Sequence, residues 1–283
     1  MSGTLYLIGT PVGNLGDLSP RAARILSEVD FIAAEDTRVT LKLLNHLNIK
    51  KPLVSYHEHN KKSRGEQIAA RLFEGENGAL CSDAGMPCVS DPGEDLVRLL
   101  GERGIPVTGV PGPTAAMTAL SLSGLPAGRF CFEGFLSTGK SSREKHLASL
   151  AAEPRTMIFY EAPHKLAATL RDLLRVFGDR RAALCRELTK LHEEVWRATL
   201  SEAAARYSEE PPRGEFVIVI EGAKPIENPP VTMEEAVLMA KELLAGGLSP
   251  SDAAKEAAAR TGLRKGDIYR RLHAGKDAVF ADD

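Results

Sequence analysis

The sequence predicts an α/β protein with two α/β domains and a small helical domain near the C-terminal end. Three observations lead to this fold class. Strand and helix signals alternate five times before residue 125, the alternation becomes irregular between residues 126 and 223, and a proline-rich segment at 224–230 precedes three helical segments. Strict alternation is typical of parallel α/β domains. We therefore expect domains at 1–125, 126–223 and 232–283.

The first domain is predicted from five strands, each followed by a helix. The first helix has Ser19 in position to cap it and Pro20 as its first residue, which is a favourable start. The second repeats leucine at helical spacing. The predicted strands are 5–8, 31–34, 53–55, 79–81 and 106–109, and the helices are one from Pro20, then 37–47, 66–73, 94–102 and one from Thr114. Repeated βα units predict a parallel sheet with helices on both faces.

The second domain is predicted to hold a mixed sheet, because its last three strands do not alternate with helices. Its strands are expected at 129–135, 156–160, 182–186, 195–200 and 216–221, with helices at 143–150 and 165–177. The proline-rich segment then reads as a linker. Three helices are expected beyond it, at 233–244, 251–260 and 265–273.

Composition predicts an ordinary globular protein without a global charge that would attract nucleic acid. Of the 283 residues, 43% are hydrophobic, and the net charge is −2. The four cysteines show no metal-ligand spacing, so buried reduced thiols are expected. The first residues lack a basic leader, and no apolar run approaches the roughly 18 residues of a membrane span. We expect a cytoplasmic protein.

Chemically dense loops follow all five strands of the first domain. The longest, at 82–93, carries Asp83, Asp91, two glycines and two prolines, where a plain turn would need two to six residues. The others lie at 9–16, 35–38, 56–60 and 110–114. Carboxyl ends of parallel strands meet at one edge of the sheet, where ligands bind. We therefore expect a cleft there, with Asp83 as a ligand contact and Asp91 shaping the turn.

Two glycine motifs suggest nucleotide binding, and neither fits well. The segment at 9–16 has G-x-x-x-G-x-x-G spacing rather than the dinucleotide fingerprint. The segment GFLSTGKS at 134–141 matches a P-loop, but Phe135 and Leu136 are bulky for a loop that wraps phosphates. A nucleotidase that uses Lys140, a basic loop facing a substrate, and a plain helix start all remain open for this segment.

Two further patterns have both a functional and a structural interpretation. His57 and His59 lie two residues apart, but no third ligand has a recognisable spacing, so no metal site is expected. The segment at 248–272 resembles a helix-turn-helix, and residues 249–276 hold seven Lys/Arg against three Asp/Glu, a net of +4. This segment either contacts nucleic acid or only closes a helical bundle.

Nine motifs in order resemble the tetrapyrrole methylase superfamily and, within it, the enzymes that methylate small-subunit ribosomal RNA. They are LIGTPVGNLGD at 7–17, AEDTR at 34–38, SYHEHN at 55–60, SDAGMP at 82–87, SDPG at 90–93, GVPGPTA at 109–115, FYEAPHK at 159–165, RELT at 186–189 and GEFV at 214–217. The sequence departs from the family pattern at Ser137, where a proline is usual, and this change produces the P-loop match.

The resemblance implies S-adenosyl-L-methionine bound between two α/β domains, usually in a homodimer. It implies methyl transfer to the ribose 2′-hydroxyl of a cytidine in the decoding region, in naked 16S RNA or in the 30S particle. The positions that match cofactor contacts of the family are Val12, Asp83, Ala84, Gly85, Met86, Thr114, Ala115, Ala162, Leu188 and Glu215.

Methyl transfer from a sulfonium needs positioning rather than a metal, and the weakly acidic 2′-hydroxyl needs a base. The candidates for this base are Asp36, His57 and Glu58, although residues 35–38 could instead cap the following helix. The candidate RNA contacts are Arg38, Lys140, Arg143, Arg264, Lys265, Arg270 and Arg271. A corrin-precursor C-methyltransferase is the nearest rival, and a transcriptional regulator with an effector-binding core is a more distant one.

Overall fold

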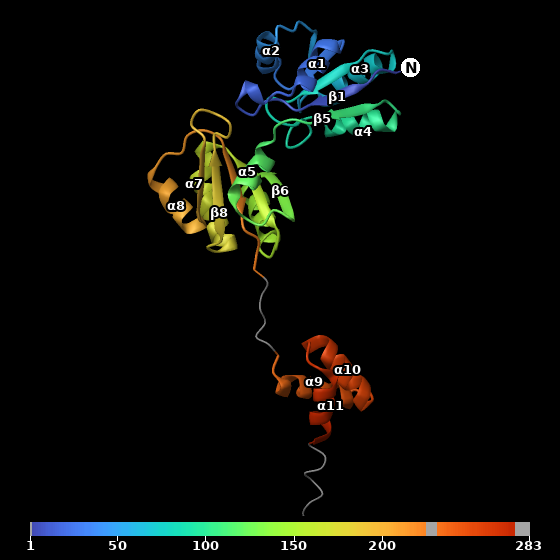
Figure 1. The fold of residues 1–283 in the computed structure, drawn as a ribbon, viewed down its shortest axis with the longest axis vertical. Coiled ribbons are helices and arrows are strands. Elements are labelled where there is room, and N and C mark those ends of the chain that lie inside the picture. The colour runs from blue at the N-terminus through green and yellow to red at the C-terminus, as the bar shows by residue number, and fades with distance from the viewer. Residues whose placement is uncertain (1, 225–230, 275–283) are drawn as a thin grey trace, which may run out of the picture. The chain divides into compact units, whose positions relative to one another are not determined.

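A computed structural model describes residues 2–224 and 231–274 of the chain (Figure 1). The chain divides into two compact units, residues 1–223 and residues 224–283, which are described separately below. The predicted proline-rich linker lies almost wholly outside the described residues.

The first unit begins with the predicted parallel sheet, in the strand order β3-β2-β4-β1-β5. Its strands are β1 (Leu5–Ile8), β2 (Phe31–Ala34), β3 (Leu53–Ser55), β4 (Gly78–Cys81) and β5 (Val107–Val110). Strand β1 pairs in parallel with β4 and β5, with Leu5 opposite Gly78 on one side and Val107 on the other, and β2 pairs in parallel with β3 and β4. All five carboxyl ends therefore meet at one edge.

Helices cover both faces of this sheet, as predicted. They are α1 (Pro20–Glu28), α2 (Thr37–His46), α3 (Lys61–Phe73) and α4 (Glu94–Glu102), with a short 3₁₀ turn, η1 (Leu15–Asp17). Leu26 and Leu44 of α1 and α2 pack on one face with Ile8. Ile68 and Leu96 of α3 and α4 pack on the other face. Ser19 caps α1 by accepting from the Ala22 amide at 3.1 Å.

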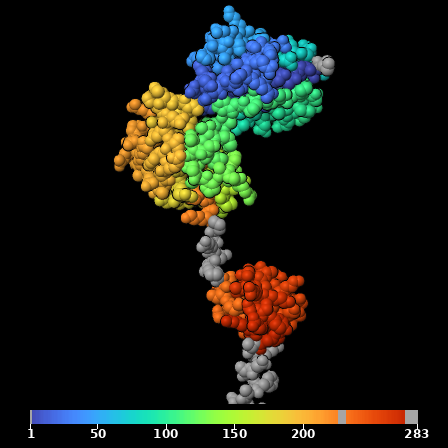
Figure 2. Space-filling model, in the orientation of Figure 1, coloured from blue at the N-terminus to red at the C-terminus, as the bar shows by residue number. Residues whose placement is uncertain are grey.

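The fifth helix, α5 (Ala115–Ser123), packs against the second sheet rather than the first. Ala116, Ala119 and Leu120 lie in one buried cluster with Ile158 and Val217 of that sheet. Although α5 falls within the predicted first domain, it thus joins the two halves of the unit. In the space-filling view, the half with the first sheet (blue to cyan) lies directly against the half with the second (green to orange) (Figure 2).

The second sheet is mixed, as predicted, in the order β6-β7-β10-β8-β9. Its strands are β6 (Phe130–Phe135), β7 (Thr156–Glu161), β8 (Arg181–Arg186), β9 (Glu194–Thr199) and β10 (Phe216–Ile220), and only the β6–β7 pair is parallel. Its helices are α6 (Lys140–Ser149), α7 (Pro163–Phe177) and α8 (Leu200–Glu209). Helix α8 was not expected, and it starts directly at the end of β9 with a capping box of Thr199 and Glu202.

The second unit is a bundle of α9 (Met233–Ala245), α10 (Pro250–Thr261) and α11 (Lys265–Ala274), close to the three predicted helices. Buried alanines, among them Ala236 and Ala254, let the helices approach one another, and Ile268 and Leu272 complete the core. Gly262 ends α10 in the left-handed conformation, at φ 74°. No helix in the described part of the chain is long and apolar enough to cross a lipid bilayer.

Candidate active site

A cavity of about 750 Å³ opens between the carboxyl edge of the first sheet and the second sheet. Each position expected at the cofactor from the family resemblance lines it: Val12, Asp83, Ala84, Gly85, Met86, Thr114, Ala115, Ala162, Leu188 and Glu215. The sequence had not singled out several further lining residues as cavity residues, among them Glu35, Asp91, Phe135, Tyr160, Glu161 and Lys190. Of these, Glu35 directly follows strand β2, and this position in the sequence is a signal that it faces the cavity edge.

The floor of the cavity is built by loops that follow β1, β4 and β5. The amide of Thr10 donates to the carbonyl of Gly85 at 2.8 Å, and the Gly85 amide returns a bond to Thr10 at 3.1 Å. A Cβ atom on Gly9 would lie 2.6 Å from the Cα of Gly112, so only glycine permits this crossing. Within the β4 loop, Cys88 and Ser90 hold positive φ angles of 70° and 63°. Such strained non-glycine residues cluster at functional sites.

An acidic wall of Glu35, Asp83 and Asp91 lies at this edge of the cavity. Burial, together with the charge of Asp83, raises the pKa of Glu35 above its usual range. Burial raises the pKa of Asp91 to about 6, helped by Glu35 and offset in part by a hydrogen bond from Ser82. Burial also raises the pKa of Asp83, although its carboxylate accepts from the Asp36 amide at 3.1 Å. A cationic ligand would relieve this crowding of negative charge.

Asp36, a predicted base, directs its carboxylate to Arg38. It accepts from the Arg38 amide at 2.8 Å and from the guanidinium at 2.6 Å, and these bonds lower the pKa of Asp36 to about 2. Asp36 therefore caps α2, which was the alternative interpretation of this segment. The Arg38 side chain is 87% exposed. It is Glu35, one residue earlier, that lines the cavity.

The other two predicted bases lie on the loop after β3, outside the residues that line the cavity. Burial and the charge of Asp83 raise the pKa of Glu35, and nearby His57 offsets this rise in part. The Nε2 atom of the His57 ring lies 3.3 Å from the side-chain amide nitrogen of Asn60. The Nδ1 atom of the same ring has no hydrogen-bond partner among the described residues. Glu58 forms an ion pair with Lys61 at 2.7 Å. The described residues contain no group of three or more His, Cys, Asp or Glu side chains placed to hold a metal ion.

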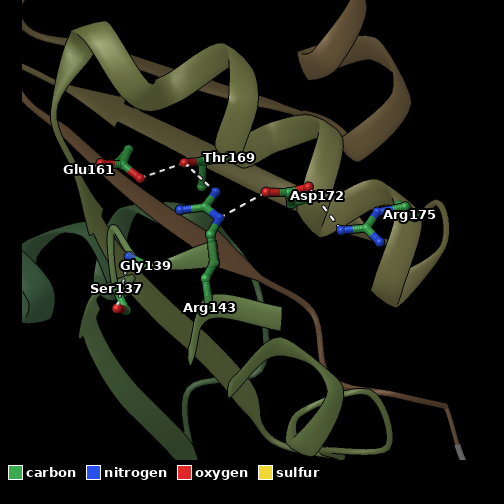
Figure 3. A network of polar contacts seen from close by, with 7 residues as sticks. All are labelled: Ser137, Gly139, Arg143, Glu161, Thr169, Asp172 and Arg175. Atoms are coloured by element: carbon green, nitrogen blue, oxygen red, sulfur yellow. Dashed lines mark hydrogen bonds and ion pairs between the residues drawn. The ribbon is translucent and has the colours of Figure 1, made fainter. Parts of the chain in front are cut away.

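A polar network supports the opposite wall, at the end of β7 (Figure 3). The buried carboxylate of Glu161 accepts from the Ala162 amide at 2.9 Å and from the Thr169 hydroxyl at 2.5 Å. Arg143 donates to the Thr169 hydroxyl at 2.9 Å and to Asp172 at 2.8 Å. The side chain of Arg143 is only 13% exposed. These contacts give Arg143 a structural role, and its expected contact with RNA stays a prediction.

The P-loop match at 134–141 does not fold as a P-loop. Gly134 and Phe135 belong to strand β6, and Leu136 is buried in the core of the second sheet. Only residues 136–139 separate that strand from α6, which begins at Lys140. Within this short turn the Gly139 amide is bound by the Ser137 hydroxyl at 3.3 Å. This turn therefore lacks the long open loop of backbone amides with which a P-loop surrounds a phosphate. Lys140 is exposed and still suits a contact with a phosphate.

The four remaining predicted RNA contacts lie in or just before α11 of the second unit. Arg271 is paired with Glu234 of α9 at 3.0 Å, Arg270 with Asp267, and Lys265 with the Ser251 hydroxyl at 3.0 Å. Arg264 has no carboxylate within ion-pair distance among the described residues.

Comparison with known proteins finds a matching family model for each of the two units. Residues 4–204 match the Tetrapyrrole (Corrin/Porphyrin) Methylases, and residues 233–276 match the RsmI C-terminal HTH domain. Two relatives, from Synechocystis sp. and Xylella fastidiosa, are each named ribosomal RNA small subunit methyltransferase I. They are 49% and 48% identical to this chain, over 95% and 94% of its length and 96% and 98% of their own.

A solved structure with the same fold is uroporphyrin-III C-methyltransferase from Thermus thermophilus complexed with S-adenosyl homocysteine. It is 23% identical, has a TM-score of 0.54, and the match covers 77% of this chain and 97% of that one. This structure shows the fold, and the family models together with the relatives at 49% and 48% identity show the family. The chain belongs to the tetrapyrrole methylases, in the branch of the ribosomal RNA small subunit methyltransferases I.

Proposed function

We propose that this chain transfers the methyl group of S-adenosyl-L-methionine to the ribose 2′-hydroxyl of a cytidine in the decoding region of 16S ribosomal RNA. The observation that carries this proposal is its 49% identity, over 95% of its length, to a protein named ribosomal RNA small subunit methyltransferase I. A corrin-precursor C-methyltransferase is disfavoured, because the chain also matches the C-terminal HTH domain over residues 233–276.

The cavity fits the proposed cofactor. S-adenosylmethionine, when bound, supplies an electrophilic methyl group on a cationic sulfonium. The acidic wall of Glu35, Asp83 and Asp91 suits that positive charge. Small side chains at Ala84, Gly85, Thr114 and Ala115 let a ligand approach the backbone of the cavity wall closely. The related fold crystallised with S-adenosyl homocysteine supports the same ligand class.

The chain must hold the ribose hydroxyl in line with the methyl group and remove its proton as the new O–C bond forms. Glu35, Asp36, His57 and Glu58 are the candidate bases. The geometry favours Glu35, because it lines the cavity and His57 lies near it, whereas Asp36 and Glu58 are bound by cations. Burial raises the pKa of Glu35, which makes its carboxylate a stronger base than an exposed one.

The proposed partner is small-subunit RNA, naked or within the 30S particle, and the compartment of that substrate is the cytoplasm. Exposed Arg38 and Lys140 are proposed to contact phosphates, and the basic residues at 264–271 of the second unit are proposed to add affinity. A homodimer is proposed from the family resemblance.

One experiment tests this function. The protein is incubated with methyl-labelled S-adenosylmethionine and either naked 16S RNA or 30S particles that lack the modification, and the label is located by nuclease mapping. We expect label on the 2′-oxygen of one cytidine in the decoding region. A uroporphyrinogen substrate, run in parallel, should stay unlabelled. Absence of label from both RNA substrates would refute the proposal.

A further inference from the structure

Phe135 places an aromatic ring at the cavity although most of that ring is open to solvent. It lies at the end of β6, lines the cavity, and is 58% exposed. Val89 and Met117 also line the cavity while largely exposed. A large apolar side chain left open to solvent loses the free energy that burial would give. An exposed ring that lines a site is therefore a candidate contact for a ligand.

A β-bulge aims Phe135 into the cavity. Phe132 pairs with Ile158 of β7, but the next pairs are Gly134 with Phe159 and Phe135 with Tyr160, so Glu133 is an extra residue. In a regular strand, residues three apart point to opposite faces. The bulge reverses this alternation, and Phe132 and Phe135 therefore share the face of Tyr160. Bulges next to active sites commonly redirect side chains in this way.

The bulge itself depends on Gly134. This residue has a φ of 59°, in the left-handed region. A Cβ atom there would also lie 2.9 Å from the hydroxyl oxygen of Ser90 on the loop after β4. The glycine that resembled the first residue of a P-loop is therefore a bulge residue that lets strand and loop meet.

The ring of Phe135 rests on a rigid support. Its centroid lies 5.5 Å from that of Tyr160, and Phe132 lies 5.0 Å from Tyr160 on the same side of the sheet, both in edge-to-face geometry. The Tyr160 hydroxyl accepts a hydrogen bond from the Ala116 amide at 3.2 Å. An aromatic side chain held in this way is pre-organised to bind a flat ligand.

We propose that Phe135 is the stacking platform for the nucleobase of the acceptor nucleotide, an inference that rests on the proposed function. A nucleotide whose ribose is methylated in a cavity must leave its helical stack, and stacking on an aromatic side chain replaces the contacts that it loses. Phe135 is not among the positions that match cofactor contacts of the family. Lys140, five residues further on and exposed, is the candidate contact for the flanking phosphate.

The test compares Phe135→Ala with Phe135→Tyr, which keeps an aromatic face. A matched control is Phe73→Ala, because Phe73 is also an exposed phenylalanine, at 73%, but lies at the end of α3 outside the cavity lining. Base–aromatic stacking is worth enough for Phe135→Ala to raise the KM for RNA by roughly 10-fold or more. Calorimetry should show cofactor binding within about 2-fold of wild type, a difference far below that of a lost stacking contact. Phe135→Tyr should restore the KM for RNA, and Phe73→Ala should not change it.

Two outcomes would overturn the inference. Weaker cofactor binding with an unchanged KM for RNA would assign the ring to the adenine of the cofactor, and no change in either would assign it to packing alone. Phe135→Leu addresses folding, because it keeps an apolar side chain without an aromatic face and should behave like Phe135→Ala. Failure of the proposed function itself is distinguishable, since wild-type protein would then label no RNA at all.

Discussion

The hydroxyl of Thr169 donates a hydrogen bond of 2.5 Å to the buried carboxylate of Glu161 and accepts one of 2.9 Å from Arg143 (Figure 3). Glu161 in turn holds the backbone amide of Ala162, a residue of the cavity wall. The Thr169 hydroxyl of α7 thereby connects Arg143 of α6 to the cavity wall through Glu161.

Replacing Thr169 by valine should destabilise the protein and weaken cofactor binding together. Valine fills a similar volume but cannot donate, so one oxygen of Glu161 stays buried without this partner. A buried polar atom left in that state costs about 1–3 kcal/mol of unfolding free energy. Urea denaturation measures the stability, and calorimetry with S-adenosyl homocysteine measures the binding. Thr169→Ser keeps the hydroxyl and should retain both, while unchanged stability in Thr169→Val would refute the role assigned to this bond.

Substitutions at Glu35 and Asp36 should separate the two neighbouring carboxylates. Loss of a general base lowers kcat by about 100-fold or more, so Glu35→Gln should show a loss of that order with cofactor binding retained. Asp36→Asn should lose far less, because its carboxylate faces Arg38 and asparagine is an equally good helix cap. Single-turnover methylation of RNA measures both. A larger loss of kcat in Asp36→Asn than in Glu35→Gln would instead identify Asp36 as the base.

The acid limb of the pH–rate profile gives a second measurement of the same assignment. Burial raises the pKa of Glu35, and a base acts only when ionised. Wild-type turnover should therefore fall as the pH drops through the raised pKa of Glu35. The residual activity of Glu35→Gln should lose that limb, whereas Asp36→Asn should keep it.

Asp91→Asn should stabilise the cofactor-free protein at neutral pH. The folded pKa of Asp91 is about 6, above the value of about 3.9 expected for an unfolded aspartate. The protonated form is favoured in the fold, so the wild type loses stability as the pH rises through about 6. The melting temperature of Asp91→Asn, relative to that of the wild type, should therefore rise between pH 4 and pH 8. Asp17→Asn, at an exposed aspartate outside the cavity lining, is the control and should show no such trend.

The same variant should bind the cationic cofactor less tightly, since one carboxylate of the acidic wall is gone. Stabilisation without cofactor combined with weaker binding distinguishes a ligand-facing aspartate from one that only shapes a turn. A melting temperature that stays equal to that of wild type at every pH would contradict the first part of this prediction.

Local sequence patterns predict much of this fold. Strands 5–8, 31–34 and 53–55 have the bounds expected from their apolar runs, and Ser19 with Pro20 starts α1 as expected. The dense loops line one edge because parallel strands in βα units all point the same way. A mixed second sheet is predicted because the last three of its predicted strands do not alternate with helices.

The errors arise where distant contacts decide the structure. Gly134 fits a P-loop by local spacing, and only the register shift in the pairing of β6 with β7 shows a bulge there. The sequence shows no turn between β9 and α8, because the capping box at Thr199 starts the helix directly at the end of the strand. Asp91 was interpreted as a turn residue because nothing in its neighbours in sequence shows that it faces a cavity completed by the second sheet.

Arg264 and Arg271 should contribute differently to RNA binding by the second unit. The guanidinium of Arg271 is already paired with Glu234 of α9, whereas Arg264 has no acidic partner among the described residues. A free arginine that binds a phosphate releases counterions, so Arg264→Ala should weaken RNA binding and reduce the slope of log affinity against log salt by roughly one. Arg271→Ala should change this slope less and should loosen the bundle slightly, because an exposed ion pair contributes at most about 1 kcal/mol. Filter binding of the full chain to 16S RNA between low and moderate salt measures both slopes. If neither variant changes its slope, the bundle serves only for packing, which was the alternative left open by its sequence.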